Sequence, residues 1–342
     1  MSLTSMLKGK REIDIELQTI LRDVIPTKKQ FFTLSGAEAF SSNTSSIVPY
    51  NLSNPYHSSV VGTAFDYMAR FIVSQYISSN KENVTEGLTA KHGLEIIKGY
   101  CDQKTSKSLV TKFNKGINLV KRFVYESDMS YEELLSCASY MARLEHIYRS
   151  GMPPKDIKGS LFGREEKEII ADLKHLCEVF IERFMILEVI TPENNVVFNP
   201  HFGFASMRCG GADADIYIDG TLYDFKTSKK SGYNWKEIAQ ICGYYILNCI
   251  AVGLRDNTAK LYGFEIKRLA FYRARYGEIE FIDISTMETD KMDLTVSKIK
   301  DLLSIPSEEL SVRTRTERYS REGQKVKTNI FKKIISMLGL KV

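Results

Sequence analysis

Residues 210–230 read GGADADIYIDGTLYDFKTSKK. Within them, Asp219-Gly220 separates two runs of β-forming residues, a pattern typical of a hairpin with a two-residue turn. This turn fixes the register, because each step outward along one strand is matched by a step along the other. The expected opposing pairs are Ile218 with Thr221, Tyr217 with Leu222, Asp215 with Asp224, and Asp213 with Lys226.

Directly opposed residues share a face of a hairpin, so this register sorts the side chains into two sets. One set is apolar and suited to a protein core, and it consists of Ala214, Ile216, Ile218, Tyr223 and Phe225. The opposite face is expected to carry four ionisable groups, namely Asp213, Asp215, Asp224 and Lys226. One interpretation of the second set is that it faces solvent, as polar residues of a half-buried hairpin commonly do.

Asp215 and Asp224 support another interpretation, because like charges at cross-strand contact distance repel unless a positive charge lies between them. Mg²⁺ or Mn²⁺ would supply that charge, since hard cations prefer carboxylate and carbonyl oxygens. The two aspartates and the backbone carbonyl of Phe225 would form an incomplete shell, which leaves positions for water and a substrate phosphate. Lys226 would point at the same site.

The hairpin resembles the PD-(D/E)XK nuclease superfamily, whose core is an Asp on one strand and (Asp/Glu)-x-Lys on its partner. Here these residues are Asp215 and Asp224-Phe225-Lys226. On the helix that follows, Gln240 and Tyr244 match the Q-x-x-x-Y signature of the RecB-like branch, and their spacing places both on one helical face.

A third match lies upstream of the hairpin. RecB-like nucleases carry G-x-x-x-H on an N-terminal helix, where the His is a metal ligand, and this sequence reads GTAFD from Gly62 to Asp66. Asp66 replaces the His and can still ligate Mg²⁺ or Mn²⁺; the alternative is an exposed helical Asp. The ligand on the first strand is also open, because the register favours Asp215 whereas a Gly three residues before the Asp, another habit of the family, favours Asp213.

The resemblance implies a hydrolase that cleaves phosphodiester bonds, with DNA favoured over RNA as its partner. Asp215 and Asp224 would hold the metal, which polarises the phosphate and lowers the pKa of a bound water. Lys226 would orient that water or stabilise the transition state, and Gln240 and Tyr244 would border the cleft. Repair, recombination or defence against foreign DNA would suit the RecB-like branch.

Basic residues near the hairpin could contact phosphate groups, or they could form a solvated rim; they are Lys229, Lys230, Arg273 and Arg275. The alternative function is a catalytically silent nucleic-acid-binding or partner-docking protein that retains the nuclease fold. A protein partner could dock on the largely helical region 80–190 or on the C-terminal tail. Residues 311–342 hold nine Lys or Arg against two Asp or Glu, and 329–342 has the pattern of a short basic amphipathic helix.

Around the hairpin, the spacing of apolar residues changes from helical to strand-like near Pro192. Helices are predicted over 59–77, from 92, and over 108–126, 131–149, 164–184 and 235–251. Strands are predicted over 196–199, 214–218, 221–227, 260–266, 269–274 and 278–282. The expected class is α/β (α+β), and the resemblance implies a restriction-endonuclease-like mixed β-sheet core flanked by helices, with a large helical N-terminal part.

This pattern divides the chain into four parts. They are a partly looped N-terminal segment 1–58, a helical region 59–190 that contributes the first core helix, a nuclease core 191–300 and a basic C-terminal tail 301–342.

The composition of the 342 residues, with 43% hydrophobic and 26% charged residues and a net charge of +5, argues against disorder and coiled coil. The most apolar uncharged stretch, 238–254, is shorter than the roughly 20 residues of a membrane span. The N-terminus has no apolar core of a secretory signal, so a cytoplasmic protein is expected. Six cysteines without a C-x-x-C pair indicate free thiols. The RecB-like nucleases that bind an iron-sulfur cluster use three cysteines near the C-terminus. No cysteine of this sequence follows Cys249, so no cluster is expected.

Overall fold

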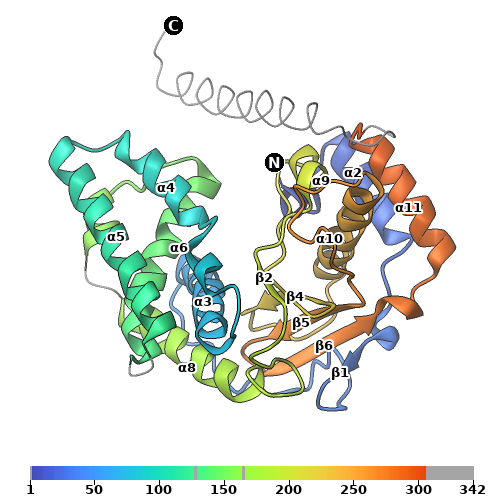
Figure 1. The fold of residues 1–342 in the computed structure, drawn as a ribbon, viewed down its shortest axis with the longest axis horizontal. Coiled ribbons are helices and arrows are strands. Elements are labelled where there is room, and N and C mark those ends of the chain that lie inside the picture. Colours follow the sequence, from blue (N-terminus) through green and yellow to red (C-terminus); the bar gives the residue numbers. More distant parts are fainter. Residues whose placement is uncertain (1, 127–128, 164–165, 306–342) are drawn as a thin grey trace, which may run out of the picture.

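The computed structural model describes residues 2–126, 129–163 and 166–305. Within them, a large helical N-terminal part is followed by a six-stranded mixed sheet with helices on its faces (Figure 1). The mixed α/β class expected from the sequence is therefore confirmed. The amphipathic helix predicted over 329–342 and most of the basic tail lie outside the described residues.

The helical part begins at a well-capped helix, α3. The side chain of Asn54 accepts a hydrogen bond from His57 N (2.9 Å), and Pro55 occupies the first helical position, where its missing N–H costs nothing. The helices are α3 (Pro55–Tyr76), α4 (Thr89–Lys98), α5 (Gln103–Tyr125), α6 (Leu135–Ser150), α7 (Ile157–Phe162) and α8 (Lys167–Arg183). The predicted helices are confirmed, although the stretch 131–149 opens with a 3₁₀ turn, η3 (Tyr131–Leu134), before α6. None of the described helices is both long and apolar enough to cross a membrane.

The sheet has the strand order β1-β6-β5-β4-β3-β2. Its strands are β1 (Phe32–Thr33), β2 (Val196–Phe198), β3 (Ile216–Ile218), β4 (Thr221–Lys226), β5 (Arg268–Arg273) and β6 (Glu278–Asp283). β4 and β5 run parallel, and the other neighbouring pairs are antiparallel. The parallel pair requires a crossover connection, which α10 (Trp235–Gly253) supplies.

The strand predicted over 260–266 is wrong, because these residues form turns between α10 and β5. Phe264 N–H donates to Leu261 O (3.0 Å), and Gly263 between them has a φ of +85°, in the left-handed region. Lys260 Nζ meanwhile donates to Phe198 O at 3.0 Å. Residues 260–266, although rich in β-forming residues, thus connect α10 to β5 and do not pair as a strand of the sheet.

The predicted hairpin register is confirmed from the Ile218–Thr221 pair to the Ile216–Tyr223 pair. The regular ladder ends there. Asp215 N–H donates to Tyr223 O (3.3 Å), so that Asp215 and Ile216 both lie opposite Tyr223, which is the arrangement of a β-bulge. Asp215 therefore approaches Asp224 from an irregular position rather than as its strict cross-strand partner.

Two expectations for the residues before the bulge are wrong. Ala214, expected on the face of Ile216, packs into the core on the opposite face of the sheet. Asp213, expected opposite Lys226, forms an isolated bridge with His201. Both follow from the bulge, because one extra residue in a strand shifts the alternation of side chains beyond it.

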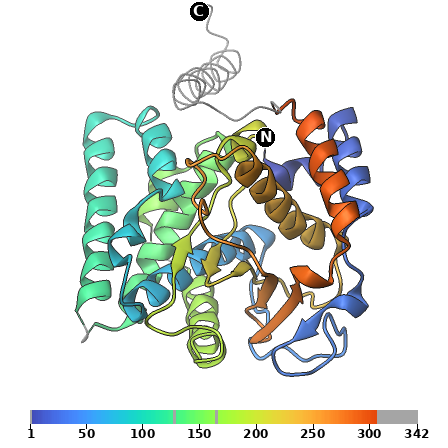
Figure 2. The same ribbon diagram turned by 45° about the vertical axis from the view of Figure 1, so that its right-hand side comes forward.

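Helices cover both faces of the sheet (Figures 1 and 2). On one face, α3 and α8 pack through an aromatic cluster in which Phe65 stacks on Tyr272 (centroids 6.3 Å apart) and Phe184 lies edge-on to Tyr223 (5.1 Å). On the other face, α10, α2 (Glu12–Arg22) and α11 (Thr289–Leu302) enclose a second core, with α9 (Gly203–Arg208) at its end.

The N-terminal segment belongs to this second core. In α1 (Leu3–Met6), Leu3 N–H donates to Gly211 O (2.9 Å), just before the hairpin. Further along, Phe32 in β1 pairs with Phe281 in β6 at the edge of the sheet. The beginning of the described chain is thus fixed against residues more than 200 positions later in the sequence.

Candidate active site

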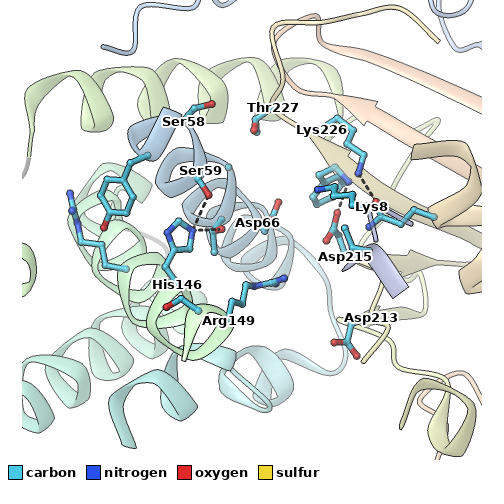
Figure 3. Close-up of a pocket in the computed structure, with 18 of the residues that line it drawn as sticks. Lys8, Ser58, Ser59, Asp66, His146, Arg149, Asp213, Asp215, Lys226 and Thr227 are labelled. Atoms are coloured by element: carbon cyan, nitrogen blue, oxygen red, sulfur yellow. Dashed lines mark hydrogen bonds between the residues drawn. The ribbon is translucent and has the colours of Figure 1, made fainter. Parts of the chain in front are cut away.

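A pocket of about 1070 Å³ opens between the helical part and the sheet (Figure 3). One wall comes from α3, α6 and α7, and the other from the end of β4, from α10 and from the N-terminal segment. The predicted catalytic and metal-binding residues all line it: Asp66, Asp213, Asp215, Asp224, Phe225, Lys226, Gln240 and Tyr244. Residues of α3 and of the hairpin, distant in the sequence, therefore meet in one place.

The hairpin contributes two carboxylates and an ammonium group. Asp224, which is 3% exposed, forms an ion pair through Oδ2 with Lys226 Nζ, one strand period along β4. Asp215 Oδ2 accepts a hydrogen bond from the backbone N–H of Phe225. The repulsion expected between the two aspartates is thus relieved in this structure by Lys226 and by a backbone donor.

The first half of α10 places two further predicted residues against Lys226. Gln240 Oε1 lies 3.4 Å from Lys226 Nζ, and Gln240 Nε2 donates to Tyr244 Oη at 2.7 Å. The spacing of four residues puts both side chains on one helical face, as predicted. Gln240 and Tyr244 form a chain of contacts that restricts the position of the lysine.

Asp66 faces the hairpin from α3, across the pocket in Figure 3. The glycine four residues earlier permits this approach, because a Cβ built on Gly62 would lie 3.0 Å from Thr227 Oγ1, directly after β4. A Cβ at position 62 would require the Thr227 side chain or its surroundings to shift by a few tenths of an ångström. The G-x-x-x-D pattern therefore has a structural basis in this fold: the glycine brings the helix close and the aspartate reaches the pocket.

Four carboxyl groups in the pocket have pKa values above the ordinary range of aspartate, namely those of Asp66, Asp213, Asp215 and Asp224. Burial raises the pKa of Asp215 to about 7, and the charge of Asp224 adds to the effect. Burial also raises the pKa of Asp224, although Lys226 opposes the shift. The pKa of Asp66 is raised well above its ordinary value, first by burial and then by the charges of Asp215, Glu145 and Asp224. A bound cation would lower the cost of ionising such a group.

The donor chemistry fits Mg²⁺ or Mn²⁺, because Asp66, Asp215 and Asp224 offer carboxylate oxygens. Asp224 Oδ2 is buried and forms the ion pair with Lys226, so a cation bound there would share this oxygen with the lysine or displace it. The geometry is less complete: in the described ranges no group of three or more His, Cys, Asp or Glu is so arranged that it could hold a metal ion. In this arrangement Lys226 neutralises Asp224.

The opposite wall of the pocket carries polar groups that the sequence did not locate. On α6, Glu145 is buried and accepts a hydrogen bond from Arg149 Nε (2.7 Å), while His146 faces α3. Glu145 and Arg149 have the i, i+4 spacing of a helical ion pair, which is visible in the sequence. Nothing in the sequence indicates that α6 packs against α3 at this pocket. The spacing of Glu145 and Arg149 therefore predicts an ion pair but not its place in the pocket.

The prediction that Arg273 and Arg275 contact nucleic acid needs correction. Arg273 is 2% exposed and forms ion pairs with Glu280 (2.7 Å) and Glu237 (2.6 Å). Arg275 is 1% exposed and donates to both carboxylate oxygens of Asp172 (2.8 and 2.6 Å). Both guanidinium groups are buried and paired with these carboxylates, and they therefore have a structural role.

Lys229 and Lys230 are exposed and lie beside the pocket, as predicted. They line a smaller cavity of about 390 Å³, which shares Lys226 and Thr227 with the larger one. Lys229 Nζ lies 4.9 Å from the centre of the Tyr50 ring. Both lysines remain candidates for phosphate contacts.

No family model, curated protein or solved structure matches this chain. The resemblance to PD-(D/E)XK nucleases therefore depends on the residues named above and on their placement around the pocket.

Proposed function

We propose that this chain is a metal-dependent nuclease of the PD-(D/E)XK type, RecB-like branch, that hydrolyses phosphodiester bonds of DNA. One observation carries the proposal: Asp66 from α3, Asp215 and Asp224-x-Lys226 from the hairpin, and Gln240 and Tyr244 from α10 all line one pocket. The sequence alone indicates each of these motifs. Their order along the chain, with a helix directly after the second strand, also suits a restriction-endonuclease-like core.

Asp215 and Asp224, with Asp66 as a third donor, would hold Mg²⁺ or Mn²⁺. A cation held there would supply a Lewis acid for the phosphate and lower the pKa of a bound water. Although burial lowers the pKa of Lys226, the charges of Asp224 and Glu237 raise it overall, so the ammonium group remains charged. Lys226 can therefore donate hydrogen bonds to a phosphate oxygen or to the attacking water, and Gln240 restricts its position.

A second candidate function, a catalytically silent nucleic-acid-binding protein, is favoured by two observations. Lys226 already neutralises Asp224, and the described residues contain no ready three-ligand metal site. Such a protein would bind DNA in the same pocket and would not cleave it under any metal.

The test is cleavage of labelled DNA with Mg²⁺ or Mn²⁺, with EDTA as the negative control. We expect cleavage that EDTA stops and that falls at least about 100-fold in Asp224→Asn and in Lys226→Ala, because each variant removes electrostatic stabilisation of the transition state. Matched controls are Asp283→Asn and Lys267→Ala, whose side chains are exposed and lie outside the pocket. Equal cleavage by all four folded variants would refute the assignment, and DNA binding without cleavage under every metal would favour the silent protein.

A further inference from the structure

Helix α5 carries charge of one sign. Its 23 residues include six Lys or Arg and no Asp or Glu, which gives the helix a charge of +6. The helices α8 and α11, by contrast, combine basic and acidic residues in nearly equal numbers. A concentration of one charge on a single element attracts ions of the opposite charge.

Five of the six basic residues share the exposed face of α5. They are Lys104, Lys107, Lys115, Lys121 and Arg122. At about 100° per residue, these positions fall within an arc of about 120° around the helix axis. The sixth, Lys112, is half-buried, and its Nζ donates to Leu161 O at 2.7 Å. The five exposed positions are called the α5 face below.

Packing determines that this face points outward. A Cβ built on Gly116 would lie 2.6 Å from Cys137 Sγ of α6, so the buried side of α5 fits closely against its neighbour. Gln75 Nε2 of α3 also donates to Phe123 O near the end of α5 (2.8 Å). Figures 1 and 2 show α5 at the outer edge of the helical part, on the side away from the sheet. The α5 face is therefore presented to solvent.

The charges of the α5 face are poorly balanced within the chain. Among the described residues, Arg122 pairs with Glu126 (3.2 Å), but the four lysines of this face form no ion pair. Like charges three residues apart, as at 104 and 107, destabilise a helix. Lys104 also lies in the first turn, where the helix dipole disfavours a positive charge. The charge pattern thus costs stability in the free protein, and a bound polyanion would remove that cost.

The chemistry around the lysines favours a phosphodiester backbone as that polyanion. Asn114 and Asn118 are exposed on the same side of α5, and amide side chains commonly contact phosphate groups of DNA. A helix that binds a membrane surface needs an exposed apolar face. In α5 the apolar residues are buried in the core, among them Leu109, Phe113 and Val120.

The length of α5 suits a duplex. At 1.5 Å per residue the helix is about 34 Å long, close to one turn of B-form DNA, which is about 34–36 Å. A duplex carries one negative charge per about 1.7 Å of its axis, twice the density of one strand. Aromatic side chains that stack on unpaired bases are a feature of single-strand binding, and on α5 an exposed ring occurs at the last residue, Tyr125.

We propose that the α5 face binds the phosphate backbone of duplex DNA without reading its sequence. Residues of α5 line neither of the two cavities described above, so this is a second contact surface, separate from the carboxylate site. The identity of the polyanion as DNA rests on the proposed function, whereas binding through the α5 face does not require cleavage.

The test is the affinity of the full chain for a fluorescent duplex of about 20 base pairs, two helical turns, measured by anisotropy in EDTA over a series of salt concentrations. The variant combines Lys104→Gln, Lys107→Gln, Lys115→Gln and Lys121→Gln, which keep a high helix propensity at exposed positions. We expect its affinity to fall about tenfold or more at about 0.1 M salt. The slope of log affinity against log salt should decrease by about 2–4, because each phosphate contact contributes about 0.9.

A matched control removes the same number of charges elsewhere. It combines Lys29→Gln, Lys267→Gln, Lys291→Gln and Lys298→Gln, which are exposed and lie outside α5 and both cavities. Its affinity and salt slope are expected to stay close to those of the wild type. Equal binding by the two folded variants, or no binding of the duplex by the wild type, would overturn the inference.

Two further readouts separate this inference from its alternatives. Vesicles of phosphatidylserine and phosphatidylcholine test for a lipid partner: if they bind the wild type but not the α5 variant, while both proteins bind the duplex equally, the inference is overturned. Cleavage assays separate it from the proposed function. Duplex binding through the α5 face without cleavage under any metal refutes the nuclease and leaves this inference standing. Cleavage by a wild type whose duplex affinity the α5 variant matches does the reverse.

Discussion

Arg275 makes a buried ion pair whose removal has a calculable cost. Its guanidinium donates to both oxygens of Asp172 (2.8 and 2.6 Å) and, through Nε, to Thr227 O (2.7 Å), next to Lys226. The side chain is 1% exposed. Arg275→Ala therefore leaves the Asp172 carboxylate buried without its counter-charge and leaves the Thr227 carbonyl without its donor.

Breaking one partner of a buried pair costs about 3–5 kcal/mol, because the remaining charge stays desolvated. The unfolding entropy of a chain of this length is about 0.7 kcal/mol per kelvin on a per-residue average. A loss of about 4 kcal/mol then lowers the melting temperature by about 6 °C.

The assay is denaturant and thermal unfolding of Arg275→Ala beside Arg268→Ala. Arg268 also forms a 2.7 Å ion pair, with Asp283, but the two side chains are 40% and 38% exposed, so its loss is expected to cost about 1 kcal/mol or less. The double variant Arg275→Met with Asp172→Leu is expected to recover most of the stability, because it leaves no unpaired charge. If Arg275→Ala is no less stable than Arg268→Ala, the reasoning is refuted.

Three further predictions follow from single contacts. Gly93→Ala is expected to lower the free energy of unfolding by about 1–3 kcal/mol, because the new Cβ would meet Leu144 O of α6 at 1.7 Å. Gly253→Ala, with open space around it, is expected to be neutral or slightly stabilising. Equal unfolding midpoints for the two variants would contradict this prediction. Burial lowers the pKa of His146 below its unfolded value of 6.5. Its neutral form therefore stabilises the fold above that pH, and this contribution is lost as the pH falls. The free energy of unfolding, measured between about pH 7 and pH 5, should change less in His146→Gln than in the wild type. Mn²⁺ is expected to raise the melting temperature of the wild type and not that of Asp224→Asn, since a ligand that binds the folded state stabilises it by mass action; an equal rise in both would argue against a site at Asp224.

The hairpin was predictable because its determinants are local. Asp219-Gly220 fixes the pairing of Ile218 with Thr221, and two more pairs follow by counting. The β-bulge at Asp215 was not predictable, because it depends on how the chain before the strand meets β2 and α9. Asp215, Asp224, Lys226 and Asp213 therefore all line one pocket, whereas the strand partner expected for Asp213 and the face expected for Ala214 were wrong.

Burial of charge was the main feature hidden from the sequence. Arg273 and Arg275 stand close to a turn and suggested an exposed rim, whereas each meets a carboxylate from another element, Glu237 or Asp172. In the same way, Glu145 and Arg149 read as an ordinary helical pair. Their place in the pocket depends on contacts between α3 and α6, such as that of Tyr67 with Glu145 (2.6 Å), which no local pattern records.

The core beneath α10 is built from both ends of the described chain, residues 3–40 and 202–305. On a ribosome that adds 5–20 residues per second, β1 waits for β6, about 245 residues later, on the order of 10–50 s. Meanwhile Leu17, Leu21 and Phe31, which are buried in the finished fold, have no partners from the later segment. A nascent chain that ends near residue 200 is thus expected to carry a packed helical half and an apolar N-terminal segment that chaperones can bind.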